Sequence, residues 1–188
     1  MPDFYDSLNE RIRTFLEEQM LFFVATAPTE GRINLSPKGM NTFRILNDNT
    51  VGYLDVTGSG NETSAHLLDD GRMTFLFCSF SKKPWIVRLY GRGVVVQPGE
   101  EQWEATLSHF EPLPGTRQIM LLHIDSIQTS CGYGVPVYDF VEERHTLVKW
   151  SEKKGEVGLD DYKKEKNIQS IDGLPTHFGI SYQSEHKG

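Results

Sequence analysis

The stretch from Gly58 to Leu67 (GSGNETSAHL) has the residue types that an anion-binding turn needs. Gly58 and Gly60 accept backbone angles that other residues avoid, and Asn61 is a good N-cap for the helix predicted to follow. The free N–H groups at the start of that helix, with the positive end of its dipole behind them, form a ready site for a phosphate. The alternative is that the glycines turn the chain and Asn61 caps a helix that packs by its apolar residues.

Basic residues on neighbouring strands could supply positive charge to the same anion. Lys38, Arg44, Arg88 and Arg92 all lie in predicted strands or at their ends. Arginine presents a planar fork of donors that matches phosphate, although a basic residue on a strand is usually just solvated. Lys38, Arg44 and Arg88 are the cations that we retain as candidates.

A second distinctive segment is the loop from Ser130 to Pro136 (SCGYGVP). Its glycines permit unusual backbone angles, and Tyr133 could close a ligand cleft of the same or a neighbouring subunit. The alternative is a loop that folds back and packs on the domain. Cys131 has no base near it in the sequence, so we assign no catalytic thiol.

Composition excludes several function classes. The chain has 188 residues, enough for one domain, and 19 Lys and Arg against 26 Asp and Glu give a formal charge of −7. This charge argues against nucleic-acid binding and favours a small-molecule substrate. The two cysteines form no metal or disulfide pattern, and no apolar run is long enough for a membrane span. We therefore expect a cytoplasmic protein with reduced thiols, no metal and no membrane association.

Hydrophobic periodicity predicts a mainly β fold with flanking helices. The predicted strands cover residues 20–27, 32–36, 43–46, 51–56, 73–80, 85–97 and 117–127. The predicted helices cover residues 3–19, 100–110, 145–153 and 160–166, with the last dozen residues extended or mobile. Six or seven strands with few helices suggest a closed antiparallel barrel. We expect one domain over residues 1–188, with the barrel core at about 20–127 and a C-terminal extension at about 128–188.

Two glycines interrupt the longest strand signal, WIVRLYGRGVVVQ. Gly91 and Gly93 lie in its middle, where glycine commonly marks a bulge, a bend or the close approach of another backbone or a ligand.

The order of these segments resembles a known family. FFVATAPTEGRINLSPKG, a hairpin, GSGNETSAHLL, MTFLFCSF and WIVRLYGRGVVV follow one another as in the pyridoxamine 5′-phosphate oxidase-like family of FMN-binding split barrels. The resemblance covers roughly residues 20–127. It implies a six-stranded antiparallel Greek-key split barrel that forms a homodimer, with one FMN in each of two clefts between the subunits. The tail that begins SCGYGVP is similar to a less characterised branch of oxidases, not to the vitamin B6 enzyme itself.

The resemblance also implies where FMN would bind. Its phosphate would lie at residues 59–64, and its ring against the backbone around residues 36–38 and 41–44. The family's oxidases have Ser-Arg-Lys where this chain has Asn61-Glu62-Thr63, so Arg44 or Arg88 would have to supply the missing charge. The expected cofactor-binding residues are Lys38, Arg44, Ser59, Asn61, Thr63, Ser64, Arg88 and Tyr133.

The function that this resemblance implies is an FMN-dependent oxidoreductase acting on an unidentified small molecule. The flavin would carry the redox chemistry, so no side-chain acid or base need be essential and the catalytic residues stay unassigned. The alternatives are a deazaflavin-dependent reductase and a non-enzymatic flavin- or haem-binding module on the same fold.

Overall fold

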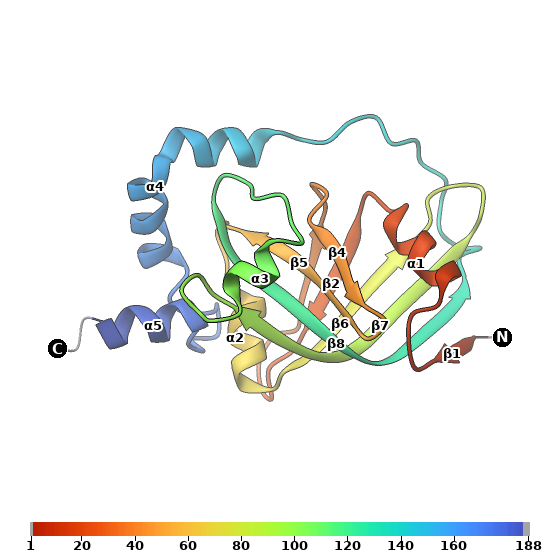
Figure 1. The fold of residues 1–188 in the computed structure, drawn as a ribbon, viewed down its shortest axis with the longest axis horizontal. Coiled ribbons are helices and arrows are strands. Elements are labelled where there is room, and N and C mark those ends of the chain that lie inside the picture. The colour runs from red at the N-terminus through yellow and green to blue at the C-terminus, as the bar shows by residue number, and fades with distance from the viewer. Residues whose placement is uncertain (1, 186–188) are drawn as a thin grey trace.

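The structure is a computed structural model that describes residues 2–185. Within this range, one antiparallel sheet of eight strands curls into a barrel, with helices at its ends and on its outside (Figure 1). The strands are β1 (Asp3–Tyr5), β2 (Phe22–Thr26), β3 (Asn34–Lys38), β4 (Phe43–Asn47), β5 (Thr50–Val56), β6 (Arg72–Cys78), β7 (Trp85–Val96) and β8 (Thr116–Cys131). Their order in the sheet is β3-β2-β6-β7-β8-β5-β4, and β1 pairs with β8.

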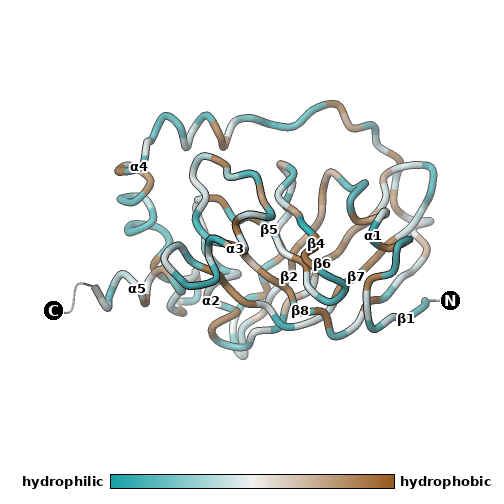
Figure 2. Tube along the Cα trace, viewed as in Figure 1, coloured by the Kyte–Doolittle hydropathy of each residue, from teal (hydrophilic) through white to brown (hydrophobic). Residues whose placement is uncertain are grey.

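The helices are α1 (Glu10–Glu17), α2 (Glu62–Asp69), α3 (Trp103–Leu107), α4 (Thr146–Lys166) and α5 (His177–Glu185). Helix α2 packs against β2, β6 and β7, and α5 packs against α2. Hydrophobic residues concentrate along the strands, whereas much of α4 is hydrophilic (Figure 2). In residues 2–185, none of the helices combines the length and the apolar character needed to cross a membrane.

The mainly β split-barrel fold is confirmed, but the sheet has eight strands instead of six and is not closed. Strands β3 and β4 form its two edges and make no ladder with each other; the turn Gly39–Thr42 joins them. Inside this seam, the ring of Phe43 on β4 lies 5.5 Å from that of Phe22 on β2 and 4.9 Å from that of Phe77 on β6. Aromatic packing therefore holds the two edges together where hydrogen bonds do not.

The prediction of one helix over residues 3–19 was wrong at its start. Residues 3–5 form β1, which pairs with the long strand β8, with Tyr5 opposite Ile127. The helix begins only after Asn9, whose side chain accepts a hydrogen bond from the Ile12 N–H at 3.0 Å. The apolar spacing around Phe4 is compatible with a helix or a strand, and pairing with the free edge of β8 makes these residues a strand.

The C-terminal extension is more helical than predicted. The two predicted pieces at 145–153 and 160–166 form α4, which bends at Gly155, where φ is 66°. Residues 177–185, expected to be extended or mobile, form α5, and the remainder of that prediction falls outside the described residues. Figure 1 shows the extension running over the top of the barrel, from the end of β8 to α4, and bringing α5 beside α2. Contacts with the barrel, described below, stabilise a helix that has little amphipathic pattern of its own.

The glycine prediction at the centre of β7 is confirmed. The register between β7 and β8 shifts between Tyr90 and Gly91, and a Cβ added at Gly91 would lie 1.9 Å from the backbone oxygen of His123. A Cβ at Gly93 would lie 2.5 Å from the Leu67 side chain. The two glycines therefore mark a β-bulge and the close approach of α2.

We predict that Gly91→Ala lowers the free energy of unfolding by about 3 kcal/mol, because the new methyl group must displace backbone of β8. Urea denaturation followed by circular dichroism measures this. Gly134→Ala is the matched control, since a Cβ there meets nothing within 4 Å, and we expect it to change the free energy by less than about 0.5 kcal/mol. Equal effects of the two substitutions would contradict the bulge geometry.

Candidate functional site

Three cavities follow the seam between β3 and β4. We call them the wide, middle and narrow cavities, with volumes of about 360, 220 and 180 Å³. The wide and middle cavities share Gly39 and Thr42 as lining residues. The middle and narrow cavities share Lys38, Asp55, Gly60 and Arg117. The cavities therefore adjoin one another along the turn Gly39–Thr42 and the end of β3.

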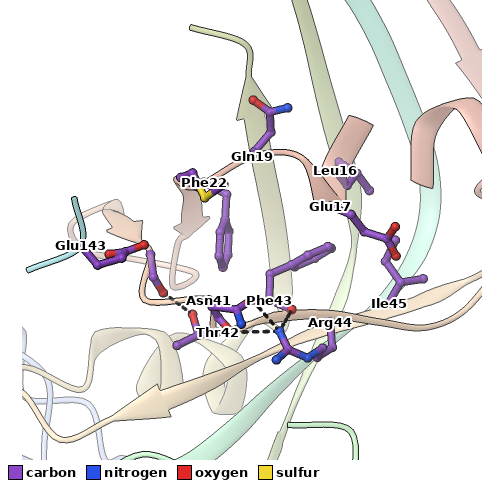
Figure 3. A pocket seen from close by; sticks show the side chains of 12 residues that line it. Leu16, Glu17, Gln19, Phe22, Asn41, Thr42, Phe43, Arg44, Ile45 and Glu143 are labelled. Atoms are coloured by element: carbon purple, nitrogen blue, oxygen red, sulfur yellow. Dashed lines mark hydrogen bonds between the residues drawn. The ribbon is translucent and has the colours of Figure 1, made fainter. Parts of the chain in front are cut away.

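The wide cavity has an aromatic lining with charges at its margin. The rings of Phe22 and Phe43 line it, with Glu17 of α1 and Glu143 of the C-terminal extension on opposite sides (Figure 3). Arg44 also lines it, but its guanidinium is already engaged. It donates to the backbone oxygens of His109 at 3.0 Å, Asn41 at 2.9 Å and Phe43 at 2.6 Å, and to Asn41 Oδ1 at 3.1 Å. Arg44 therefore fixes the backbone that lines the cavity.

The turn between the edge strands is strained. Met40 and Asn41 have φ angles of 59° and 52°, and no other non-glycine residue between 2 and 185 has a positive φ. Asparagine tolerates this conformation, but methionine rarely adopts it. The Thr42 hydroxyl donates to the Gly39 oxygen at 2.8 Å and helps to hold the turn. Strained backbone of this kind clusters at ligand-binding sites, and here it borders the cavities of the seam.

A buried ion pair closes the narrow cavity. Arg117 of β8 donates to Asp55 Oδ2 of β5 from Nη2 at 2.7 Å and from Nε at 3.0 Å, and Gln118 Nε2 donates to the same oxygen at 2.8 Å. Lys38 Nζ lies 3.6 Å from Asp55 Oδ1. Burial alone would raise the pKa of Asp55, but the charges of Arg117 and Lys38 and the hydrogen bonds outweigh it and hold the pKa below its usual value.

Several buried polar atoms beside the narrow cavity lack a hydrogen-bond partner. Among the described side chains these include Ser36 Oγ and Gln118 Oε1. Ser36 lines the cavity, and the Lys38 ammonium lies 5.0 Å from the centre of the Tyr53 ring. Burial raises the pKa of Tyr53 well above its usual value, and the Asp55 carboxylate adds to this effect, so the hydroxyl stays protonated. Unsatisfied buried polar groups are costly, and Ser36 Oγ, which belongs to a lining residue, is in a position to bind a polar ligand.

The predicted cofactor-binding residues fall into separate places. Lys38, Asn61 and Thr63 line the narrow cavity, and Arg44 lines the wide one. The remaining four lie outside the three cavities. Ser59 and Tyr133 are exposed, Arg88 donates to Ser130 Oγ at 3.3 Å, and the buried Ser64 contacts His177 of the extension.

Asn61 occupies the N-cap position of α2 as expected, but its side chain does not cap the helix. Its Oδ1 accepts from Gln118 Nε2 at 2.7 Å, and its Nδ2 donates to the backbone oxygen of Asn167 at 3.4 Å. The amide thus ties α2 to β8 and to the C-terminal extension.

The extension is fastened onto the predicted phosphate cradle. Asn167, which is fully buried, accepts from Arg117 Nη1 at 2.8 Å and donates from Nδ2 to the backbone oxygen of Gly58 at 3.0 Å. Glu62 accepts from the Ile171 N–H at 3.1 and 3.2 Å. The His177 N–H donates to Ser64 Oγ at 3.0 Å. Residues of the cradle that were predicted to meet a phosphate therefore have protein partners.

Comparison with known proteins gives the family. The family model described as Pyridoxamine 5′-phosphate oxidase matches residues 8–131. The chain belongs to this family. It is 38% identical over 195 residues to the pyridoxamine 5′-phosphate oxidase family protein ustO of Aspergillus flavus, an alignment that covers 93% of this chain and 78% of that protein.

Solved structures share the family fold at low sequence identity. HupZ of Group A Streptococcus is 20% identical with a TM-score of 0.51, and the match covers 64% of this chain and 91% of that chain. A solved protein of Lactobacillus delbrueckii is 16% identical with a TM-score of 0.54, with coverage of 65% and 94%. Each match leaves about a third of this chain uncovered. These likenesses support the split-barrel fold.

Four residues at the family's barrel seam were missed by the sequence reasoning: Asp55, Arg117, Glu143 and Asn167. Asp55 had a detectable signal, because it is a charged residue in a largely apolar strand, where a charge is rarely buried without a partner, whereas Arg117 lies beside Thr116 and Gln118 at the polar start of β8. Glu143 and Asn167 had none, since they belong to polar segments whose position depends on tertiary contacts. Within residues 2–185, no cluster of three or more His, Cys, Asp or Glu side chains could hold a metal ion.

We predict that Asp55→Asn lowers the free energy of unfolding at pH 7 by about 3–5 kcal/mol, because it leaves Arg117 buried without its counter-charge. The pKa of Asp55 is lower in the folded than in the unfolded state, so the carboxylate stabilises the fold above its unfolded pKa and loses this effect as the pH falls through the folded value. Urea denaturation at pH 7 and pH 3 should therefore show a smaller difference between wild type and variant at pH 3.

Asp48→Asn is the control for this measurement. Asp48 pairs with Arg13 at the surface, where its side chain is 68% exposed, and surface pairs contribute at most about 1 kcal/mol. If Asp55→Asn costs no more than Asp48→Asn at pH 7, the buried pair does not have the role described here.

Proposed function

We propose that this chain is a flavin-dependent oxidoreductase that acts on a small molecule. Membership of the pyridoxamine 5′-phosphate oxidase family supports this, because the family typically binds a flavin. The observation that carries the proposal for this chain is the strained turn Gly39–Thr42, which borders both the wide and the middle cavity at the seam of the barrel. Backbone held in a rare conformation beside a cavity is the kind of feature that ligand binding retains.

The wide cavity suits the ring of a flavin. Its volume of about 360 Å³ lies within the usual range for small-molecule sites, and Phe22 and Phe43 give it apolar, aromatic walls. Arg44 and the backbone of residues 41–43 would orient the ring, with Lys38 and Thr42 in the middle cavity along the attached chain. When bound, the flavin would supply the redox centre, while these residues position it and exclude water.

The phosphate of FMN fits the narrow end less well. FMN is the form of flavin that the resemblance implies, and Arg44 was expected to supply charge to its phosphate. Arg44 instead lines the wide cavity, whereas Lys38 and Arg117, the cations that line the narrow cavity, both pair with Asp55. The residues that line the three cavities therefore suit the flavin ring and its attached hydroxylated chain better than they suit the phosphate of FMN.

A homodimer is part of the proposal. Five hydrophobic side chains between residues 133 and 141 are 57% to 88% exposed: Tyr133, Val137, Tyr138, Phe140 and Val141. A contiguous exposed apolar segment is typical of an interface, and Tyr133 would meet a ligand only if it reached the cleft of a neighbouring subunit. We expect sedimentation velocity at micromolar concentration to give the mass of a dimer, and a monomer alone would contradict this part of the proposal. We also propose a cytoplasmic location, which we infer from the amino-acid composition.

The purified protein should show the absorption spectrum of a flavin, either as isolated or after reconstitution and gel filtration. Anaerobic bleaching of this spectrum by a nicotinamide donor would identify a reductase. A Soret band would favour the haem-binding alternative, and reduction of an added deazaflavin but not of flavin would favour the deazaflavin reductase. Absence of any bound flavin after reconstitution would contradict the proposed function.

A further inference from the structure

We propose that the narrow end of the seam selects a flavin without a terminal phosphate, so that riboflavin binds at least as tightly as FMN. This inference rests on the proposed function and adds the chemical class of the ligand. It follows from the charges that line the narrow cavity, from the position of the C-terminal extension and from the neutral polar side chains in the cavity lining.

The charges that line the narrow cavity disfavour a phosphate. Lys38 and Arg117 line the narrow cavity, but both are paired with Asp55, at 3.6 and 2.7 Å. Glu62 lines the same cavity, so its two cations are balanced by two carboxylates. The side chains of Asp55 and Arg117 are each only 5% exposed, which leaves little water to screen a further charge. A phosphate dianion would have to separate an existing ion pair or lie near like charges, and both are unfavourable in a poorly hydrated site.

The C-terminal extension leaves no room for a phosphate without displacement of its contacts at the start of α2. A phosphate would meet free N–H groups at the start of α2, and the C-terminal extension packs and hydrogen-bonds at this place. Asn167 bonds with Gly58 and Arg117, and Arg117 Nη1 also donates to the backbone oxygen of Gly60 at 3.1 Å. The carbonyl oxygen of Asn167 accepts a hydrogen bond from the Thr176 hydroxyl at 2.7 Å, which fixes the extension in place. A ligand reaching beyond the narrow cavity would have to displace this buried network, whereas a ligand that ends there would not.

The lining of the narrow cavity also contains neutral polar groups. Ser36 Oγ lines the narrow cavity and is buried without a hydrogen-bond partner, and the neutral polar side chains of Asn34, Asn61 and Thr63 line the same cavity. Hydroxyl groups and an amide oxygen are suited to hydroxyls, which donate and accept in turn. The hydroxylated chain of riboflavin carries such groups and brings no charge. The site therefore offers what a polyhydroxy chain needs and lacks the unpaired cations that a phosphate needs.

The test compares the two flavins on the full-length protein freed of bound cofactor. Fluorescence titration gives the dissociation constants of riboflavin and FMN under the same conditions, and we expect the value for riboflavin to be equal or lower. FMN binding tighter than riboflavin by more than the error of the titration would overturn this inference and leave the proposed function standing. Binding of neither flavin would overturn the proposed function, and this inference with it.

Glu62→Gln tests the electrostatic argument directly. The variant removes one negative charge but keeps an oxygen that can accept from the Ile171 N–H, so the contact with the extension is retained. We expect the affinity for FMN to rise about tenfold and that for riboflavin to stay the same, since only FMN carries the charge. An equal change for both flavins, or no gain for FMN, would overturn the inference.

Glu104→Gln is the matched control. Glu104 is exposed on α3 and lines none of the three cavities, so the same loss of charge there should leave both affinities unchanged. Thermal unfolding of both variants shows whether each remains folded. A rise in FMN affinity of the same size in the control would mean that net charge alone is responsible, and would overturn the role of the narrow cavity.

Discussion

The ion pair between Asp55 and Arg117 is the interaction on which the seam depends. Through Asp55 it joins β5 to β8 and attracts Lys38 at the end of β3, and through Arg117 it reaches Gly60 before α2 and Asn167 in the extension. A charge buried this deeply is tolerated only when its partners satisfy it, so the positions of these five segments are coupled. Edge strand, central strands, helix start and C-terminal extension therefore meet at one buried carboxylate.

The open seam explains why the candidate site lies where it does. A fully closed barrel would pair β3 with β4 and leave no space between them, whereas here the edges are bridged on the inside by Phe43 and at one end by the turn Gly39–Thr42. That turn has to reverse the chain between two unpaired edges, and it does so with Met40 and Asn41 in a left-handed conformation. The opening and the backbone strain are two results of the same topology.

Much of the fold could be predicted from the sequence, because strand signals and glycine positions are local. The strands from β2 to β8 lie close to where alternation and apolar runs placed them, except that β3 continues to Lys38 where an end at Ser36 was expected, and Gly91 marks a bulge as expected. The start of the chain was mistaken because β1 depends on the free edge of β8, which no local pattern encodes. Helix α5 was missed for a similar reason, since it is stabilised by contacts with α2.

The candidate site was predictable only in part. The turn and helix start at residues 58–67 were recognised, and Lys38, Asn61 and Thr63 do line one cavity. The sequence could not show that Arg44 and Arg88 point elsewhere, because a shift of one residue in register moves a strand side chain to the other face of the sheet. Nor could it show that Asn167, more than a hundred residues after the cradle, would donate a hydrogen bond to the Gly58 backbone oxygen there.

The C-terminal extension binds at the helix start where this chain has Asn61-Glu62-Thr63 in place of basic residues. A helix start with unpaired lysine or arginine beside it would attract anions, and a polar segment such as the one around Asn167 would have to compete with them. With Asn61, Glu62 and Thr63 in these positions, the helix start instead bonds to the extension, and Glu62 accepts the Ile171 N–H directly. Binding at the wide and middle cavities then leaves this network intact, while binding at the helix start has to break it. Ligand binding therefore affects the position of the extension only if the ligand extends past Asp55 to the helix start.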